Sequence, residues 1–157
     1  MRVSPPEVAS PASPVSIPQT IHPTPMAHAT KPERSLLVLV VDDEPLMLPL
    51  VARILRENGY EVQVATHGLA AKQILASGMV APDLVLTDLR MPHLDGLQLG
   101  RAVAELLPSV PVAYMSAYDS ALSELSPEVL RDRFLPKPFS SDALLALVRR
   151  CIGRTTH

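Results

Sequence analysis

Hydrophobic and polar positions along residues 36–157 predict five strands that alternate with five helices. Short runs of apolar or alternating residues are typical of buried strands, and we expect them at 36–41, 60–65, 84–87, 110–115 and 133–135. Between these runs, apolar residues recur every three or four positions, which is typical of amphipathic helices. We expect helices over 47–58, 67–77, 97–107, weakly over 119–131, and over 141–152.

This alternation predicts an α/β fold. Strands that alternate with helices form a parallel sheet that is covered on both faces, and each crossover connection is right-handed. In such doubly wound sheets, ligands bind beyond the carboxyl ends of the strands. The residues that follow each predicted strand are therefore the first candidates for chemistry.

Capping residues and prolines set the expected helix boundaries. Asn58-Gly59 is expected to end the first helix, and Thr66 and Ser140 to cap the second and the last. Pro49 falls early in the first helix, which predicts a kink or a delayed start. Ser126-Pro127 has the pattern of a new helix start, so we expect the fourth helix to be short or broken.

Residues 1–35 have a different composition from the rest of the chain. They contain 8 of the 17 prolines, no glycine and no Phe, Trp or Tyr. Their scattered apolar residues cannot bury enough surface to offset the entropy lost on ordering. We interpret them as a disordered, partly polyproline-II tail, for which a spacer role is favoured over partner docking.

Composition excludes several classes of function. The formal net charge is −2, so a basic surface for direct nucleic-acid binding is not expected. The single cysteine, Cys151, excludes an internal disulfide and multi-cysteine metal sites. The longest bulky apolar run, Leu36–Val41, is far shorter than the ~20 residues of a membrane span, and residues 1–6 lack a secretory signal. We expect a cytoplasmic protein with no membrane contact.

Polar side chains gather where the predicted strands end. Asp42 and Asp43 follow the first strand, Asp88 the third, Ser116 the fourth and Lys137 the fifth. Three carboxylates brought together repel each other, and a hard divalent cation with oxygen ligands relieves that repulsion. We therefore expect a Mg²⁺ site at this edge.

The same group of residues suits phosphoryl transfer. A metal, a hydroxyl and an ammonium group around a nucleophilic aspartate can stabilise a transferring phosphoryl group. Each residue alone has a plainer explanation: an aspartate pair caps a helix, and a lysine is a solvated charge. Five such groups at the ends of four strands favour the functional interpretation.

The chain resembles the receiver domain of two-component response regulators (CheY-like). The resemblance covers residues 36–157, the predicted receiver domain, and rests on four motifs: VVDDEP at 40–45, DLRMPHLDG at 88–96, Ser116-Ala117, and Lys137-Pro138-Phe139. It implies a flavodoxin-like, doubly wound sheet of five parallel strands in the order 2-1-3-4-5, with five helices.

The resemblance also implies roles for individual residues. Asp88 would accept a phosphoryl group from a phosphohistidine. Asp43, Asp88 and the backbone carbonyl of Arg90 would ligate Mg²⁺ directly, and Asp42 mainly through water. Ser116 and Lys137 would contact phosphoryl oxygens, with Lys137-Pro138 in the cis form.

A conformational switch is implied as well. Ser116 would move inward on phosphorylation and Phe134 would turn into the vacated space, which alters the surface of the fourth helix, fifth strand and fifth helix. For Phe134, a plain core position is the alternative. Arg90 and Tyr118 flank the site, and we expect their bulk to give a long-lived phosphate.

The resulting hypothesis is a single-domain response regulator, not an enzyme with an external substrate. Its expected partners are a histidine kinase or histidine phosphotransfer protein and a downstream protein. Only residues 153–157 follow the last helix, so output is expected through protein–protein contact, phosphate relay or phosphate drainage. Alternatives are the detached C-terminal receiver of a hybrid histidine kinase, an unphosphorylated pseudo-receiver, and a haloacid dehalogenase-type phosphatase. A phosphatase of that type needs a second aspartate two residues after its nucleophile, and this chain has Arg90 at that position after Asp88.

Overall fold

The computed structural model describes residue 3, residues 34–117 and residues 119–153. The chain divides into two units, Met1–Glu33 and Arg34–His157, and every helix and strand described here lies in the second. The predicted disordered tail over 1–35 falls almost wholly outside the described residues, as does Tyr118, so both remain predictions. No helix within the described ranges is long and apolar enough to cross a bilayer.

Five parallel strands form one sheet in the order β2-β1-β3-β4-β5, as the resemblance implies. Their bounds are β1 (Leu37–Val41), β2 (Glu61–Ala65), β3 (Leu84–Asp88), β4 (Val112–Ser116) and β5 (Phe134–Pro136). All residues of β3 and β4 are buried, whereas the edge strand β2 is mostly exposed. This burial explains why the central strands have continuous apolar runs.

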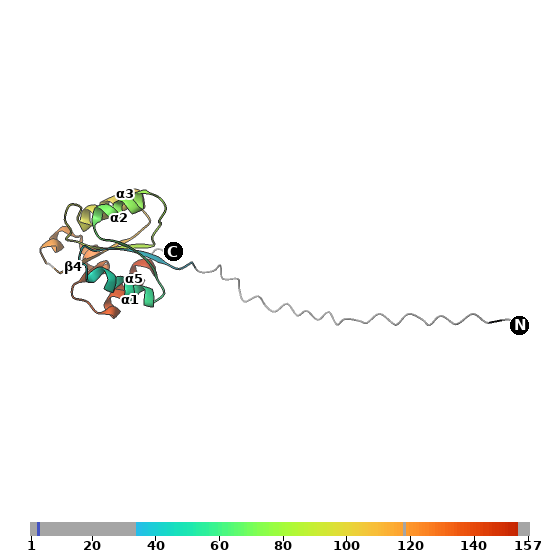
Figure 1. Cartoon of the computed structure of the whole chain (residues 1–157). Coiled ribbons are helices and arrows are strands. Elements are labelled where there is room, and N and C mark those ends of the chain that lie inside the picture. The colour runs from blue at the N-terminus through green and yellow to red at the C-terminus, as the bar shows by residue number, and fades with distance from the viewer. Residues whose placement is uncertain (1–2, 4–33, 118, 154–157) are drawn as a thin grey trace. The chain divides into compact units, whose positions relative to one another are not determined.

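Helices cover both faces of the sheet. The bounds are α1 (Met47–Glu57), α2 (Gly68–Ala76), α3 (Gly96–Leu106), a 3₁₀ helix η1 (Asp119–Glu124), α4 (Pro127–Asp132) and α5 (Ser141–Gly153). Figure 1 shows α2 and α3 on one face and α1 and α5 on the other. Side chains of the sheet therefore pack into two separate apolar layers.

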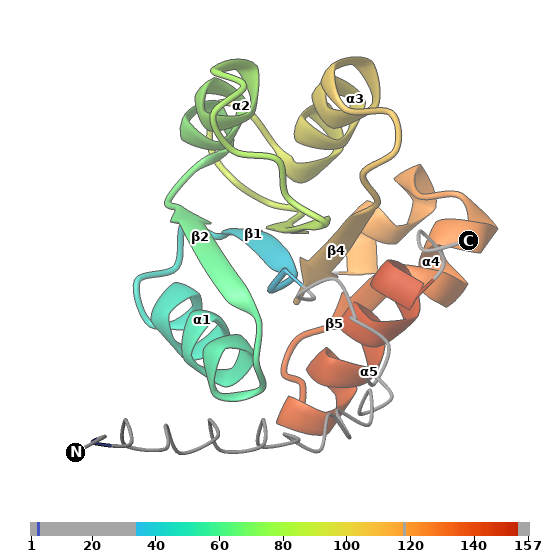
Figure 2. The ribbon, with the colours of Figure 1, turned by 90° about the vertical axis from the view of Figure 1, so that its right-hand side faces the viewer.

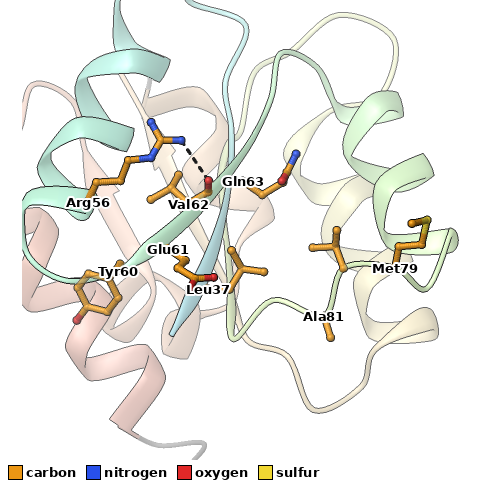
Figure 3. Close-up of a pocket in the computed structure, with 9 residues that line it drawn as sticks. Leu37, Arg56, Tyr60, Glu61, Val62, Gln63, Met79 and Ala81 are labelled. Atoms are coloured by element: carbon orange, nitrogen blue, oxygen red, sulfur yellow. Dashed lines mark hydrogen bonds between the residues drawn. The ribbon is translucent and has the colours of Figure 1, made fainter. Parts of the chain in front are cut away.

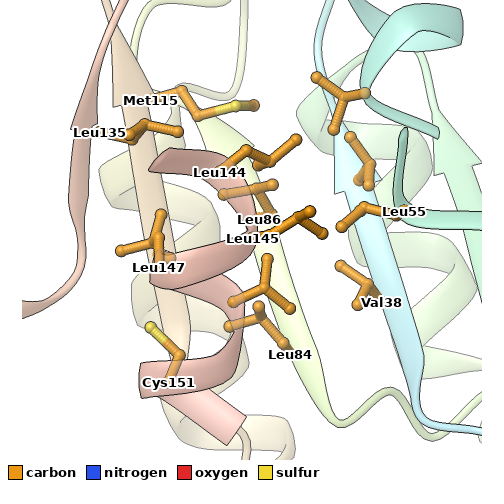
Figure 4. Close-up of a cluster of buried hydrophobic side chains, with 14 of the residues drawn as sticks. Val38, Leu55, Leu84, Leu86, Met115, Leu135, Leu144, Leu145, Leu147 and Cys151 are labelled. Atoms are coloured by element: carbon orange, nitrogen blue, oxygen red, sulfur yellow. The ribbon is translucent and has the colours of Figure 1, made fainter. Parts of the chain in front are cut away.

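The larger layer lies between the sheet and α1 and α5. Leu144 and Leu147 of α5 are almost fully buried against Leu84 and Leu86 of β3, as Figure 4 shows. The second layer, beneath α2 and α3, includes Leu39, Val85, Leu99, Val103 and Tyr114. Burial of this apolar surface is the main term that holds the strand ends in register.

Helix starts follow the expected signals with two corrections. α1 begins at Met47, so Pro49 lies in the first turn, where the missing N–H removes no helical hydrogen bond. The helix therefore begins at the residue that the periodicity predicts, and the delayed start expected from Pro49 is not seen. The prediction that Thr66 caps α2 is wrong: His67 is the cap, and its Nδ1 accepts from the Ala70 amide at 3.1 Å.

The fourth helical region is broken, as predicted. The 3₁₀ helix η1 precedes a separate α4, whose cap Ser126 accepts from the Val129 amide and whose first residue is Pro127. α4 has six residues and none of them is buried. Val129 and Leu130 of α4 pack against the apolar layer beneath α2 and α3, but both are only partly buried.

Candidate functional site

Two aspartates lie side by side because β1 and β3 are neighbours. Val41 at the end of β1 pairs with Thr87 in β3, so Asp42 and Asp88 come next in register at the carboxyl edge. Both are buried, with 1% and 5% of their surface exposed, whereas Asp43 is exposed. The sheet therefore brings two carboxylates out of solvent at the predicted edge.

Asp42, Asp43 and Asp88 form a group that suits a metal ion. One carboxylate oxygen from each lies within 4.8 Å of the other two. Oxygen donors from several carboxylates are the ligands that Mg²⁺ and Ca²⁺ take in proteins. The residues present thus fit the predicted divalent cation.

Lys137 places its ammonium group among these acids. Its Nζ lies 2.9 Å from Asp42 Oδ2, 3.2 Å from Glu44 Oε1 and 3.6 Å from Asp88 Oδ2. Lys137 follows β5, and the Lys137–Pro138 peptide is cis, as the resemblance implies. One cation therefore faces three carboxylates in a side-chain environment that is 95% shielded from solvent.

Burial and charge shift the pKa values of this group. Burial raises the pKa of Asp88 to about 6; Lys137 opposes this rise, while the negative charges of Asp42 and Asp43 add to it. Burial disfavours the charged form of Lys137, but the hydrogen bond that it donates to Asp42 and the negative charges of Asp88 and Asp42 outweigh this effect, so its pKa is raised. Lys137 is therefore a fixed cation at neutral pH.

Backbone amides hold the carboxylates in place. The Glu44 amide donates to Asp42 Oδ1 at 2.9 Å, and the Arg90 amide lies 3.4 Å from Asp88 Oδ1. Gly96 at the start of α3 lies against the carbonyl of Asp88, in a space that a Cβ would overlap. Only glycine allows α3 to approach the end of β3 this closely.

Ser116 and Phe134 lie on the neighbouring strands β4 and β5. Ser116 ends β4 and is 3% exposed, and its carbonyl accepts from the Lys137 amide at 2.9 Å. Phe134 begins β5, is half-buried, and packs against the apolar layer beneath α2 and α3. Its Cα partner on β4 is Tyr114.

Glu44 was not predicted as a site residue. It contacts Lys137 and is itself about half exposed. Its position directly after Asp42 and Asp43 is the signal in the sequence that points to it. The structure thus brings a fourth carboxylate to the same edge.

An open groove lies away from the edge of the sheet that carries Asp42, Asp43 and Asp88. It measures about 510 Å³ and is lined by residues at the start of β1, by β2, and by Arg56 and Met79. Figure 3 shows Arg56 bonded to the carbonyl of Val62 there. The lining of this groove includes none of Asp42, Asp43, Glu44 and Asp88.

Comparisons with known proteins agree with the geometry. The chain matches the family described as response regulator receiver domain over residues 38–149. It is 37% identical over 120 residues to the response regulator MprA of Mycolicibacterium vanbaalenii, a match that covers 76% of this chain and 51% of that protein. The chain spans about half the length of the curated relatives it matches.

Solved structures show the same fold. A response regulator receiver protein from Sinorhizobium medicae is 30% identical, with a TM-score of 0.70 over 78% of this chain and 98% of that one. The receiver domain of the hybrid histidine kinase CckA is 31% identical, with a TM-score of 0.61 over 74% of this chain and 98% of that one. Sequence and fold thus point to one family.

Proposed function

The chain belongs to the response regulator receiver domain family, a family of signalling domains, and we propose that it accepts a phosphoryl group on Asp88. The observation that supports this best is the contact of Lys137 Nζ with Asp42, 2.9 Å away, and with Asp88, 3.6 Å away, inside a buried group of carboxylates. This membership favours the receiver over the haloacid dehalogenase-type phosphatase.

Asp88 is the proposed nucleophile. One of its carboxylate oxygens attacks the phosphorus of a phosphohistidine, the P–N bond breaks, and an acyl phosphate forms. Lys137 and the hydroxyl of Ser116 stabilise the charge on the phosphoryl oxygens. Because Lys137 is already held by Asp42, its ammonium group needs little reorganisation as the phosphoryl group arrives.

Asp43, Asp88 and the Arg90 carbonyl are proposed to hold Mg²⁺, with Asp42 acting mainly through water. When bound, the ion neutralises the carboxylates and polarises the phosphoryl group. The support is the donor set, since one oxygen from each aspartate lies within 4.8 Å of the others.

Ser116 and Phe134 are the proposed switch. Phosphorylation draws Ser116 toward the phosphoryl group, and Phe134 turns into the space that it leaves. The neighbouring α4 has no buried residue, so it can adjust at low cost. The altered surface of α4, β5 and α5 is proposed to contact a downstream protein.

A histidine kinase or histidine phosphotransfer protein is the proposed donor. We propose a single-domain regulator, with the detached receiver of a hybrid histidine kinase as the alternative. The hybrid-kinase alternative is supported by the likeness of this chain to the receiver domain of the hybrid histidine kinase CckA.

Intact mass measurement with acetyl phosphate tests the phosphoryl acceptor. We expect one phosphoryl adduct that forms only with Mg²⁺, since the ion and Lys137 both act on phosphoryl oxygens. Asp88→Asn should abolish the adduct. Asp142→Asn, which removes an exposed carboxylate from the first turn of α5, should leave it unchanged.

The opposite results would count against the proposal. An adduct that survives in Asp88→Asn would place the acceptor elsewhere. No adduct with acetyl phosphate, together with no binding of beryllofluoride, would favour the pseudo-receiver.

A further inference from the structure

A small cavity lies where α3, β4 and α4 meet, a region visible in Figure 2. It measures about 170 Å³, and its lining does not include Asp42, Asp43 or Asp88, which form the acidic edge of the sheet. The lining residues are Gly100, Ala104, Pro108, Val110, Val112, Tyr114, Val129 and Arg133. Its wall is thus apolar except for one phenol and one guanidinium group.

Tyr114 is the buried polar group of this cavity. Only 8% of its surface is exposed, and its hydroxyl lies against Gly100, which also lines the cavity. Among the described residues, no protein atom forms a hydrogen bond with this hydroxyl. Every side-chain oxygen or nitrogen that is itself fully buried has a partner across the described residues, so the Tyr114 oxygen reaches the open space of the cavity. There it can donate to an acceptor on a bound molecule.

Arg133 adds a positive charge at the same cavity. Across the part of the chain that the structure describes, its guanidinium forms no ion pair, although Glu128 and Asp132 line a neighbouring hollow with it. Burial raises the pKa of Tyr114 and Asp95 adds to this, while Arg133 and Arg101 oppose it. The phenol is therefore a neutral donor at pH 7, near an available cation.

The volume limits what can bind. At about 30 Å³ per water, the cavity holds five or six waters, whereas cofactor pockets measure ~300–1,000 Å³. We propose that it binds a small branched-chain carboxylic acid, with the alkyl group against Val112 and Val129 and the carboxylate on Tyr114 and Arg133. Charge-assisted hydrogen bonds of this kind are stronger than neutral ones.

Titration of the full chain with 4-methylpentanoate, followed by ¹H–¹⁵N NMR, tests the proposal. We expect saturable shifts at Gly100, Ala104 and Val129, and at least about tenfold weaker binding of the neutral isostere 4-methylpentanamide. Arg133→Gln should abolish the preference for the acid, and Tyr114→Phe should reduce it. Arg149→Gln, an exposed arginine on α5, is the matched control and should keep it.

Three results would overturn the proposal. The first is equal affinity for acid and amide, and the second is the absence of saturable shifts at the cavity. The third is binding of the tetrapeptide Gly-Gly-Gly-Leu tenfold tighter than the free acid, which would assign the cavity to the C-terminus of a partner protein. None of these measurements needs phosphorylation, so their outcome is independent of Asp88.

Discussion

Single residues at the acidic edge are placed for chemistry at a cost in stability. Asp88 is buried beside Asp42 and Asp43, and its raised pKa, about 6, measures how strongly this environment disfavours the charged carboxylate. Lys137 offsets only part of that cost. A hydrophobic residue in place of the Asp88 carboxylate would make the folded protein more stable, because Asp88 is buried and the neighbouring carboxylates repel it.

Asp88→Asn is therefore expected to stabilise the metal-free protein at pH 7.5 by about 1–2 kcal/mol. Folding raises the pKa of Asp88 from 3.8 to about 6, and each pKa unit corresponds to ~1.4 kcal/mol of folding free energy. Because solvent partly screens the Asp88 charge, the expected gain in stability is smaller than the full product of these two numbers. The folded parent binds this proton more tightly than the unfolded chain, so its stability falls as the pH rises from about 4 to about 6. Urea denaturation in EDTA at several pH values measures the difference.

The advantage of the variant should be full above pH 7 and shrink as the pH falls through 6 toward 4, and it should vanish only below the unfolded pKa of 3.8, where Asp88 is protonated in both states. Asp142→Asn serves as the control, because that exposed carboxylate has no buried charge beside it. A constant difference between parent and Asp88→Asn from pH 4 to pH 8 would contradict the assignment of the shift to Asp88.

Residues at strand ends were predictable from the sequence, but contacts made by long side chains were not. Asp42, Asp88 and Ser116 follow directly from the strand pattern, because a parallel sheet fixes where each strand ends. Glu44 bonds Lys137 through a rotamer that no periodicity determines. The unpaired hydroxyl of Tyr114 likewise depends on the packing of α3 against β4.

At the scale of elements, α3 packs closely on β4 through one glycine. A Cβ on Gly100 would overlap the hydroxyl of Tyr114 and lie 3.2 Å from its Cζ. The sequence predicted both elements, yet this contact needs their relative placement. The same reason explains the wrong cap of α2: Thr66 and His67 are both polar, and only the observed backbone path places the imidazole on the Ala70 amide.

Gly100→Ala should destabilise the protein by about 1–3 kcal/mol, the usual cost of overpacking a buried contact. Tyr114→Phe alone should be nearly neutral, since the hydroxyl has no partner among the described residues. The double variant should recover part of the loss because the overlapping oxygen is gone, while the ring carbon at 3.2 Å remains close. Denaturant unfolding of all four proteins gives the coupling energy. Strictly additive effects would contradict the contact.

Ser126→Ala should weaken α4 without unfolding the domain. Loss of an N-cap costs about 0.5–2 kcal/mol, and α4 has no buried side chain through which the loss would spread. Hydrogen exchange should quicken over residues 127–132 while the global melting temperature stays nearly constant.

The matched change is Ser140→Ala, which removes the same kind of cap from the Ala143 amide of α5. Leu144, Leu147 and Val148 of α5 are fully or almost fully buried, so this variant should lower global stability by about 1 kcal/mol. Similar global losses from both serines would show that α4 is as firmly packed as α5.

At the scale of the whole molecule, the fold separates stability from chemistry. The two apolar layers lie on the faces of the sheet, while the charged groups collect at its carboxyl edge. The layers tolerate the unfavourable acidic edge because they bury many large side chains. Relief of repulsion at the edge should therefore appear as a gain in the stability of the entire domain.

Mg²⁺ should raise the melting temperature of the parent, because a ligand of the folded state stabilises it by RT ln(1 + [L]/Kd), or ~1.4 kcal/mol at ten times Kd. In EDTA, Asp88→Asn should have a higher melting temperature than the parent, because the substitution removes a repelled charge. Its melting temperature should rise little with Mg²⁺, because the substitution also removes a proposed ligand of the ion. Asp43→Asn should also gain less, and Asp142→Asn should follow the parent. Thermal melts across a Mg²⁺ series measure all four. Equal gains in the parent and in Asp88→Asn would place the ion elsewhere and separate the acidic edge from metal binding.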